Sequence, residues 1–478
     1  QKEGYITHRV LPRRDTTFIY IQPRLIAPEI AEQVRSLNFK GVGFERQFSR
    51  FYPHKEEIAH VLGYAGDDHK GQEGIELLYD VYLRGVPGRQ KVYRDAKKNI
   101  IREPELITVP LPGQDLTLTI DQRVQHVAFR SLSKAVDDHD ADAGSMVIVD
   151  VQTGEVIAMT NQPSFNPNSR SSMVPHKVRN RTLTDTFEPG STIKPFTVAA
   201  VISAGLYGPE SRIDTSPGSF RLGSYVIGDQ KNHGVLTVRQ ILEKSSNVGA
   251  VKISLDLSPE AMWEILNCVG FGKVSGLMFP GESSGRLKDF PLWHSTERAT
   301  LSYGYGMAVT TSQLAKAYSV IANGGWSVPL RVVKTGHSAS PRKRVIREEI
   351  AFALRDMLKS VVESGTGKLA SVPGYSVAGK TGTVRKSSGG KYLKDQHMAI
   401  FAGIFPADNP SLVGVVVINN PRRKGVGGGQ VAAPVFSAVM QETARFLNIY
   451  PDFAYKTREE PNQFVMSSEL SFSSEEQP

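Results

Sequence analysis

The chain has 478 residues, a length that predicts two or three domains with a sizeable hydrophobic core. Its formal net charge of +9 favours acidic partners, but the sequence has neither zinc-finger spacing nor an aromatic–basic platform, so we expect no nucleic acid partner. The single cysteine, Cys268, excludes an intramolecular disulfide framework. No apolar run reaches the about 18 residues of a membrane span, and no motif predicts a metal or another cofactor.

Residues 1–114 are rich in charges and short apolar runs, which predicts a small, strand-rich α+β domain without catalytic residues. The apolar runs include Phe18–Ile21 and Lys91–Tyr93, and a helix is expected near Pro28–Leu37. The segment Arg102–Gly113 holds three prolines and little periodicity. We therefore expect this segment to link the first domain to the second.

Residues 115–450 carry a clearer pattern and are predicted to form the catalytic domain, followed by a polar, disordered tail over 451–478. The expected strands are Leu116–Ile120, Ser145–Val151, Val156–Thr160, Tyr375–Ala378, Met398–Phe405 and Leu412–Asn419. Helices are expected at Gln122–Val136, over much of 192–320, at Glu348–Glu363 and at Val435–Leu447. The fold class that follows is α+β: one antiparallel sheet built from both ends of the region, helices on its faces, and an all-helical subdomain between.

Ser191 is the candidate nucleophile. It follows a Pro-Gly pair and precedes an apolar run that closes at Gly205, so we expect it in the first turn of a helix. Lys194 lies one turn further on the same face, near enough to accept the serine proton. The lysine must be neutral to do so, which requires burial or a nearby positive charge. The start of the helix adds backbone N–H groups suited to a developing oxyanion.

The pattern Ser-x-x-Lys occurs four times in this chain, so the significance of Ser191 depends on its companions. Ser245 and Asn247 form a Ser-x-Asn motif downstream, and Lys380 begins the sequence Lys-Thr-Gly-Thr later still. A second Lys-Thr-Gly begins at Lys334, but it precedes a loop and a basic cluster, and we interpret it as incidental. The ordered trio is the signature of penicillin-binding proteins and active-site-serine β-lactamases.

Further matching stretches extend over about residues 40 to 450. They are Arg50–Pro53, Ala59-His60 with Gly63, Gly71–Glu76, Gly85–Gly88, Asp150–Met159, Pro163–Pro167, Arg179–Arg181, Phe187–Pro195, Lys244–Gly249, Tyr303–Gly306, Ala378–Thr383 and Ala432–Phe436. With them the chain resembles a class B penicillin-binding protein, specifically the septal, FtsI-type D,D-transpeptidase of Gram-negative bacteria. The family's cytoplasmic tail, membrane helix and first pedestal segment have no counterpart here, so we expect Gln1 to be a trimmed end.

The resemblance implies a role for each residue of the trio. Ser191 would attack the carbonyl of the penultimate D-alanine of a D-Ala-D-Ala stem peptide, or a β-lactam ring, and Lys194 would take its proton. Ser245 and Lys380 would shuttle protons and supply the positive field that keeps Lys194 neutral. The N–H groups of Ser191 and Thr383 would form the oxyanion hole.

The resemblance also implies a set of substrate-binding residues: Asn247, Thr381, Gly382, Thr383, Tyr303 and Tyr305. Asn247 would hydrogen-bond the substrate amide, and the hydroxyls of Thr381 and Thr383 would hold its terminal carboxylate. Tyr303 and Tyr305 would form an aromatic wall, with ordinary core packing as the alternative. Arg385 and the loop Gly425–Gln430 would shape the rim of the cleft, unless the loop is simply a flexible connection.

The implied partners are peptidoglycan stem peptides, their lipid-linked precursor, β-lactam antibiotics and a divisome membrane protein such as an FtsW-type glycosyltransferase. The implied location is the periplasmic face of the inner membrane, with a single-pass anchor that this chain lacks.

Two alternatives stay open. One is a β-lactamase or D,D-carboxypeptidase, although none of the downstream glutamates, Glu260, Glu264, Glu282 and Glu297, has surroundings that mark a deacylating base. The other is a non-enzymatic penicillin-binding sensor of the same fold.

Overall fold

The computed structural model describes residues 26, 28–44, 48–96, 100–334, 342–388 and 391–452. The chain divides into two compact units, residues 1–51 and 52–478, and each is described by itself. In the first unit, helix α2 (Pro28–Ser36) confirms the early helix, and the Arg35 guanidinium lies 5.0 Å from the centre of the Phe44 ring. The predicted apolar run Phe18–Ile21 and the tail beyond residue 452 lie outside the described residues.

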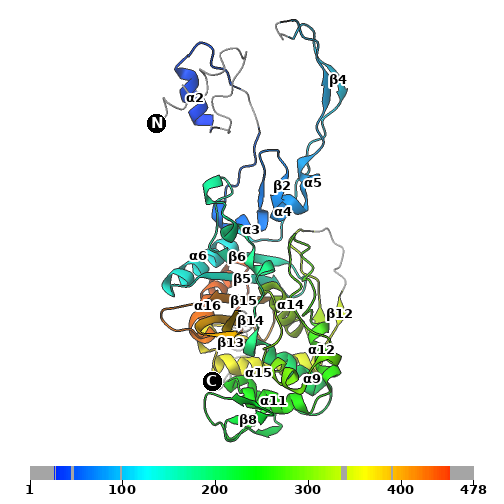
Figure 1. Ribbon diagram of the computed structural model, residues 1–478, viewed down its shortest axis with the longest axis vertical. Helices are drawn as coiled ribbons and strands as arrows, with labels where there is room; N and C mark the ends of the chain where they lie inside the picture. The colour runs from blue at the N-terminus through cyan, green and yellow to red at the C-terminus, as the bar shows by residue number, and fades with distance from the viewer. Residues whose placement is uncertain are drawn as a thin grey trace, which may run out of the picture. The chain divides into compact units, whose positions relative to one another are not determined.

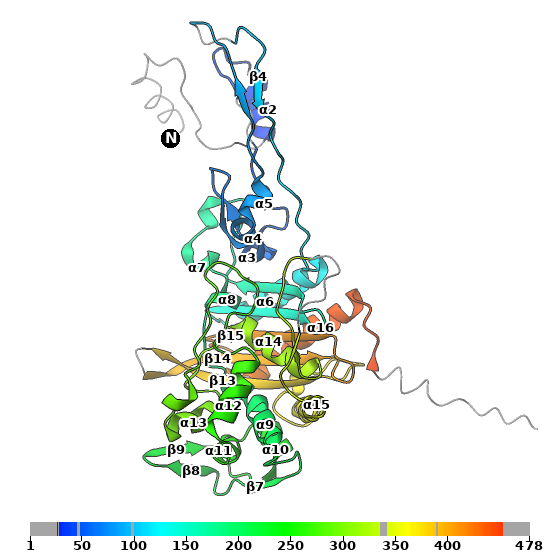
Figure 2. The same cartoon turned by 90° about the vertical axis from the view of Figure 1, so that its right-hand side faces the viewer.

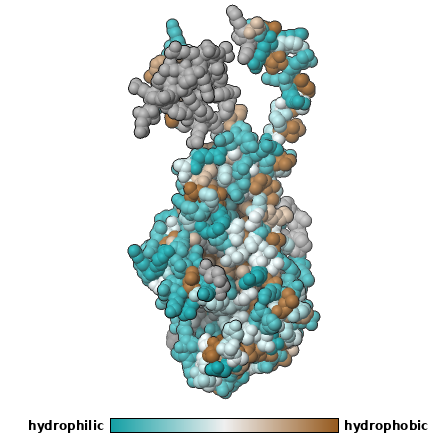
Figure 3. Space-filling model, in the orientation of Figure 1, coloured by the Kyte–Doolittle hydropathy of each residue, from teal (hydrophilic) through white to brown (hydrophobic). Residues whose placement is uncertain are grey.

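The second unit begins with short elements. They are η2 (Lys55–Glu57), α3 (Ala59–Leu62), β1 (Tyr64–Ala65), β2 (Gly71–Glu73), α4 (Gly74–Leu78), α5 (Asp80–Arg84), β3 (Arg89–Lys91) and β4 (Glu105–Thr108). The segment Arg102–Gly113, predicted to link the two domains, contains β4, which pairs antiparallel with β3. The prolines flank β4 rather than interrupt it, so they cost the strand no hydrogen bond. Large apolar side chains on this hairpin are exposed, among them Ile101 and Ile107 (Figure 3).

A five-stranded antiparallel sheet, in the order β13-β14-β15-β5-β6, forms the centre of the unit (Figure 1). Its strands are β5 (Ala143–Asp150), β6 (Val156–Gln162), β13 (Ala378–Ser388), β14 (Lys391–Phe405) and β15 (Leu412–Asn419). The sheet is built from both ends of the region, as predicted. Two strand predictions are wrong: Leu116–Ile120 makes only an isolated bridge, from Leu118 to Val333, and Tyr375 lies in a turn before β13. The Lys-Thr-Gly motif is therefore inside an edge strand rather than after one.

Helices cover both faces of the sheet (Figure 2). On one face lie α6 (Gln122–Asp138) and α16 (Gly428–Phe446); on the other lies α14 (Thr311–Ala322), with α15 (Glu348–Glu363) against β13 and α9 (Lys194–Ser203) packed on α15. Because strand side chains alternate, Met146 packs under α6 and α16, whereas its neighbour Val147 packs toward α14. The helix predicted from Val435 begins seven residues earlier, at Gly428, and continues through Pro434.

The insert between α9 and α14 contains the helices α10 (Val238–Lys244), α11 (Asn247–Leu255), α12 (Pro259–Cys268), η5 (Phe290–Leu292) and α13 (Ser295–Leu301). The prediction that it is all-helical is wrong. It also contains β7 (Arg212–Asp214), β8 (Ser219–Leu222), β9 (Tyr225–Gly228) and β10 (Val235–Thr237), which form two small antiparallel sheets. These strands are three or four residues long, too short for alternation to reveal them in the sequence. The remaining short elements are η3 (Arg170–Ser172), α7 (Pro175–Val178), α8 (Arg181–Thr184), η4 (Gly190–Ile193), β11 (Trp326–Ser327), β12 (Lys343–Arg344) and η6 (Lys368–Ala370).

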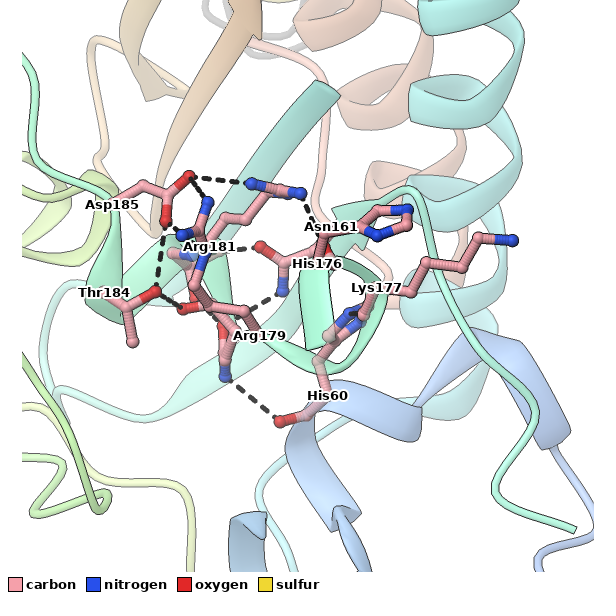
Figure 4. Close-up of polar contacts among 10 residues, drawn as sticks. His60, Asn161, His176, Lys177, Arg179, Arg181, Thr184 and Asp185 are labelled. Atoms are coloured by element: carbon pink, nitrogen blue, oxygen red, sulfur yellow. Dashed lines mark hydrogen bonds and ion pairs between the residues drawn. The ribbon is translucent and has the colours of Figure 1, made fainter. Parts of the chain in front are cut away.

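A hydrogen-bonded group that we call the junction cluster ties α3 to the segment around α8. Its members are His60, Asn161, Arg179, Asn180, Arg181 and Asp185 (Figure 4). Asp185 forms ion pairs of 2.9 Å with both Arg179 and Arg181. Asn180 donates to the carbonyl of His60 at 3.1 Å, so the cluster spans more than a hundred residues of sequence. A hollow of about 390 Å³ opens beside it, lined by His60 and Asn180 among others.

Candidate active site

Ser191 lies in the 3₁₀ turn η4, immediately before α9. The predicted helix start has 3₁₀ rather than α geometry, and Pro195 explains why. An α-helix would need the N–H of residue 195 to bond the Ser191 carbonyl, but proline has none, so the Lys194 N–H takes that carbonyl in an i→i+3 bond. The Ser191 side chain is half-buried, and the turn that carries it is held from both sides.

Two glycines allow η4 to pack closely. Gly190 has φ +54°, and a Cβ there would lie 2.4 Å from a methyl group of Val384 on β13. A Cβ at Gly304 would lie 2.1 Å from the carbonyl oxygen of Gly190, whose N–H donates to the Gly304 carbonyl at 3.1 Å. The nucleophile turn is therefore fixed between the edge strand and the loop around Gly304, where only glycine fits.

Lys194 is completely buried and points toward the segment between α10 and α11. Its Nζ donates to the Ser245 carbonyl at 2.6 Å and to Asn247 Oδ1 at 2.8 Å, and lies 3.3 Å from Ser245 Oγ. Among the described residues, no hydrogen bond joins the Ser191 hydroxyl to the Lys194 amine; the two residues are joined through the backbone, where the Lys194 N–H donates to the Ser191 carbonyl. The structure nevertheless brings the first two motifs together around one amine.

Lys380, on the edge strand β13, is also completely buried and donates to Ser245 Oγ at 3.0 Å. The Ser245 hydroxyl thus lies between two lysine amines. We call Ser191, Lys194, Ser245, Asn247 and Lys380 the reactive cluster. In the described part of the chain, neither lysine forms an ion pair with a carboxylate. Burial therefore destabilises the charged form of each amine.

The pKa values of both lysines respond to this environment. Burial lowers the pKa of Lys194 well below its usual value, the neighbouring Lys380 lowers it further, and Asp229 acts in the opposite direction. Burial alone lowers the pKa of Lys380 to about 7. Lys194 is therefore suited to hold a neutral amine near neutral pH, which is the condition for accepting a proton from a serine.

Ser245 ends α10 in the left-handed conformation, with φ +61°. A residue with a Cβ pays about 1–3 kcal/mol for such a backbone, so the surrounding contacts must hold it there. The turn directs both the carbonyl and the hydroxyl of Ser245 toward Lys194. Asp229, which no sequence motif marked, binds the next three residues of this turn.

Thr381 and Thr383 lie on one side of β13, as their spacing predicts, and each hydroxyl is already positioned. Thr381 Oγ1 lies 2.7 Å from Thr366 Oγ1, and Thr383 Oγ1 accepts the N–H of Gly428 at 3.0 Å. Gly428 is the first residue of α16, so the positive end of a 19-residue helix faces Thr383. Part of the predicted loop Gly425–Gln430 is thus the start of a helix.

Gly382 is a point of close packing. A Cβ there would lie 3.0 Å from a methyl group of Thr192 and 3.2 Å from the carbonyl oxygen of Pro189. Because Gly382 faces η4, the nucleophile turn approaches the strand without a side chain between them. The geometry therefore gives Gly382 a packing contact with the nucleophile turn.

The tyrosines predicted as a cleft wall are half-buried, and their rings meet in tilted and edge-to-face contacts. The ring centres of Tyr303 and Tyr305 are 5.5 Å apart, and Tyr392 of β14 continues the row at 5.6 Å from Tyr305. Tyr392 is 50% exposed and donates to the Glu188 carboxylate at 3.1 Å. Burial, followed by the charge of Glu188, raises the pKa of Tyr392 above its usual range. Tyr303 also packs against a small buried cluster, so this residue contributes to the core as well as to the row of tyrosines.

Sequence reasoning missed the supporting residues Asp229, Thr366 and Gly428, and did not single out Glu188 or Tyr392. Each acts on a residue far away along the chain, so no local spacing could reveal it. The second Lys-Thr-Gly, at Lys334, lies partly outside the described residues. None of the residues that line the hollow beside the junction cluster belongs to the predicted site. The site is therefore located by its catalytic side chains and not by the volume of this hollow.

Comparisons with known proteins identify two families along the chain. Residues 144–441 match the family "Penicillin binding protein transpeptidase domain", and residues 23–118 match "Penicillin-binding Protein dimerisation domain". The chain is 40% identical over 436 residues to the probable peptidoglycan D,D-transpeptidase PbpC of Pseudomonas aeruginosa, covering 91% of this chain and 77% of the relative. It is 38% identical over 452 residues to the peptidoglycan D,D-transpeptidase FtsI of Escherichia coli K12, covering 94% and 76%.

Solved structures show the same likeness. Penicillin-binding protein 3 of Mycobacterium tuberculosis, complexed with aztreonam, superposes with a TM-score of 0.76 at 32% identity over 85% of this chain and 92% of that one. The apo transpeptidase domain of Burkholderia pseudomallei penicillin-binding protein 3 gives a TM-score of 0.66 at 40% identity, covering 71% and 99%. No helix in the described ranges is long and apolar enough to cross a bilayer.

Proposed function

Because the chain belongs to the class B penicillin-binding proteins, with a dimerisation domain preceding a transpeptidase domain, we propose that it is a peptidoglycan D,D-transpeptidase of septal cell-wall synthesis. The observation that carries this proposal is the pair of buried lysines, Lys194 and Lys380, on either side of Ser245 and next to the nucleophile turn. Two buried amines without a carboxylate partner destabilise the folded protein when they are charged. Acyl transfer through Ser191 explains why they are present, because it needs a neutral amine as base.

Acylation begins with attack of Ser191 Oγ on the carbonyl carbon of the penultimate D-alanine. The neutral amine of Lys194 takes the hydroxyl proton, and the N–H groups of Ser191 and Thr383 bind the oxyanion of the tetrahedral intermediate. The proton then passes through Ser245 to the nitrogen of the terminal D-alanine as the C–N bond breaks. D-Alanine leaves and the stem peptide remains as an ester on Ser191.

Deacylation reverses the proton path with a different nucleophile. An acceptor amine, implied by the family to be a meso-diaminopimelate side chain, attacks the ester carbonyl. Its proton returns through the Ser245 and Lys194 groups to Ser191 Oγ as the ester bond breaks. The product is an amide cross-link between two stems. A β-lactam enters at the first step, and its ring-opened ester blocks the second.

Substrate binding follows from the remaining residues of the site. Thr381 and Thr383 would hold the terminal carboxylate, supported by the N-terminus of α16 at Gly428, whose partial positive charge favours an anion. Asn247 would bind the stem amide, and Tyr303 and Tyr305 would form one wall. We assign Gly382 to the same subsite, where its missing side chain lets the nucleophile turn pack against the strand beside Thr381 and Thr383.

The partner and location proposals rest on the family rather than on the reactive cluster. We infer a non-catalytic domain over residues 1–114, a transpeptidase domain over 115–450, and a periplasmic position with a membrane anchor. The exposed apolar side chains of the β3–β4 hairpin, such as Ile101 and Ile107, support a protein partner such as an FtsW-type glycosyltransferase. Stem peptides, their lipid-linked precursor and β-lactams are the proposed ligands.

The test compares the protein with its Ser191→Ala variant, together with the membrane partner, on lipid-linked precursor carrying intact stems. We expect cross-linked stems with the protein and none with the variant, as measured by mass spectrometry of the digested product. With a fluorescent penicillin we expect one rapid equivalent of label on Ser191 and very slow release. Sustained hydrolysis of the penicillin would instead establish a β-lactamase, and labelling without any cross-link would establish a sensor.

A further inference from the structure

We propose that Asp229 is a positioning residue for acyl transfer, holding the turn Ser245–Val248 in the conformation that faces the two lysines. The inference deepens the proposed function and rests on it. Asp229 directly follows β9, in the small β8–β9 hairpin of the insert, and it is half-buried.

Asp229 binds three consecutive residues of the turn. Its Oδ1 accepts the N–H of Asn247 at 2.5 Å and that of Val248 at 3.1 Å, and its Oδ2 accepts the Ser246 hydroxyl at 2.5 Å. The carbonyl of the preceding residue, Gly228, accepts from Asn247 Nδ2 at 3.1 Å. One short segment therefore holds both the backbone and the side chain of Asn247.

These bonds satisfy a need that the turn cannot meet alone. The first N–H groups of a helix have no partner within it, and Ser246, the N-cap of α11, satisfies only that of Gly249. The carboxylate of Asp229 takes the N–H groups of Asn247 and Val248 from outside the helix. It also steadies the turn next to Ser245, whose left-handed backbone has φ +61°.

The same turn provides the contacts of Lys194. Its amine binds the Ser245 carbonyl and Asn247 Oδ1, and the Ser245 hydroxyl binds Lys380. A shift of the turn would move all these acceptors together. Asp229 touches neither lysine within ion-pair distance among the described residues, so it acts through the turn and through its field.

The negative charge of Asp229 changes the pKa of Lys194 in a direction that can be measured. The charged groups that act on Lys194 are Lys380, which lowers its pKa, and Asp229, which raises it. Removal of the carboxylate charge should therefore lower the pKa of Lys194 further. The neutral amine is the base, so the acylation rate falls at low pH, where the amine is protonated. This acidic limb of the pH–rate profile should move to lower pH.

The experiment measures the second-order rate constant of acylation by a fluorescent penicillin from pH 5.5 to 9. It uses the full chain and the variants Asp229→Ala and Asp229→Asn. The asparagine keeps an acceptor for the turn but loses the charge. A matched control is Asp214→Asn on β7, in the same insert, whose carboxylate accepts from the backbone N–H and the hydroxyl of Ser216 in its own turn. Melting curves give the folded fraction to which each rate is normalised.

We expect Asp229→Ala to acylate roughly 30-fold more slowly and Asp229→Asn less than 10-fold more slowly, with the acidic limb of both at lower pH. Asp214→Asn should match the parent protein in both readouts. Normalised rates equal to the parent's, or equal losses in both Asp229 variants with an unmoved limb, would overturn the proposal. Failure of the parent to be labelled, or labelling of Ser191→Ala, would instead overturn the proposed function.

Discussion

The reactive cluster and the junction cluster both bury cations, but they treat the charge differently. In the junction cluster, Arg181 is 8% exposed and forms an ion pair with Asp185 at 2.9 Å, so its charge is compensated. In the reactive cluster, Lys194 and Lys380 are completely buried and face hydroxyl and carbonyl oxygens. A paired guanidinium stays charged and holds structure, whereas an unpaired amine lowers its pKa and becomes available for proton transfer.

The choice of residue type follows the same division. Arginine stays protonated under all ordinary conditions and binds carboxylates through a rigid fork, which suits a permanent ion pair with Asp185 in the segment around α8. Lysine changes its protonation state readily when buried, which suits a base. The comparison predicts that variants of the reactive cluster lose rate and keep stability, and that variants of the junction cluster do the reverse.

The largest expected effect is that of Lys194→Ala. Without the base, the acylation rate constant for a fluorescent penicillin should fall by about 1,000-fold or more, because general bases contribute roughly 10²–10⁴-fold. The melting temperature should be unchanged or higher, since a buried amine without a counter-charge is removed. Labelling kinetics and a thermal melt on the same sample test both parts. Retained labelling would remove Lys194 as the base.

Lys380→Ala should have a smaller effect on rate and a diagnostic effect on pH dependence. We expect a loss of about 100-fold at neutral pH, because Ser245 loses the amine that orients its hydroxyl. The positive charge of Lys380 lowers the pKa of Lys194, so its removal raises that pKa and moves the acidic limb of the rate to higher pH. This direction is opposite to that expected for the Asp229 variants. A limb that stays in place would show that Lys380 does not act on Lys194 through its charge.

Arg181→Ala tests the other side of the comparison. It removes an ion pair to Asp185 and a hydrogen bond of 2.7 Å to the His176 carbonyl, so we expect a loss of about 2 kcal/mol in the free energy of unfolding by urea. The acylation rate of the folded variant should stay within about twofold of the parent protein, since its contacts lie outside the reactive cluster.

The matched control for this prediction is Lys134→Ala, which removes an exposed i,i+4 pair with Asp138 on α6. Its urea midpoint should be indistinguishable from that of the parent, because exposed ion pairs contribute little. A folded Arg181→Ala protein that no longer acylates would contradict the division between the two clusters.

Strong periodic signals were predictable from the sequence. Glu348–Glu363 forms a helix over the predicted bounds, and the strands of the central sheet, apart from β13, were found from alternating or continuous apolar runs. Strands too short to repeat their alternation several times were not predictable. The three- and four-residue strands of the insert and the strand β4 between prolines depend on partners that no local window contains.

At Pro195 the sequence held a local signal against α geometry, but the longer apolar run that follows outweighed it in the prediction. Its missing N–H turns the helix start at Ser191 into a 3₁₀ turn, yet the apolar run after it predicts an ordinary α-helix. The Lys-Thr-Gly motif is the complementary case. Its small residues end the predicted strand early, whereas pairing of Lys380 with Ala402 on β14 extends it through the motif.

The sequence by itself determined the chemistry of this protein: a serine, a lysine one turn away, and two further motifs in a recognisable order, because nucleophile and base are specified by residue type and short spacing. Only the tertiary structure decided the electrostatics. The pKa of Lys194 depends on burial, on Lys380 from an edge strand and on Asp229 from a distant hairpin. Burial and charge are properties of neighbours in space, and the fold brings Lys380 close to Lys194 from 186 residues further along the chain.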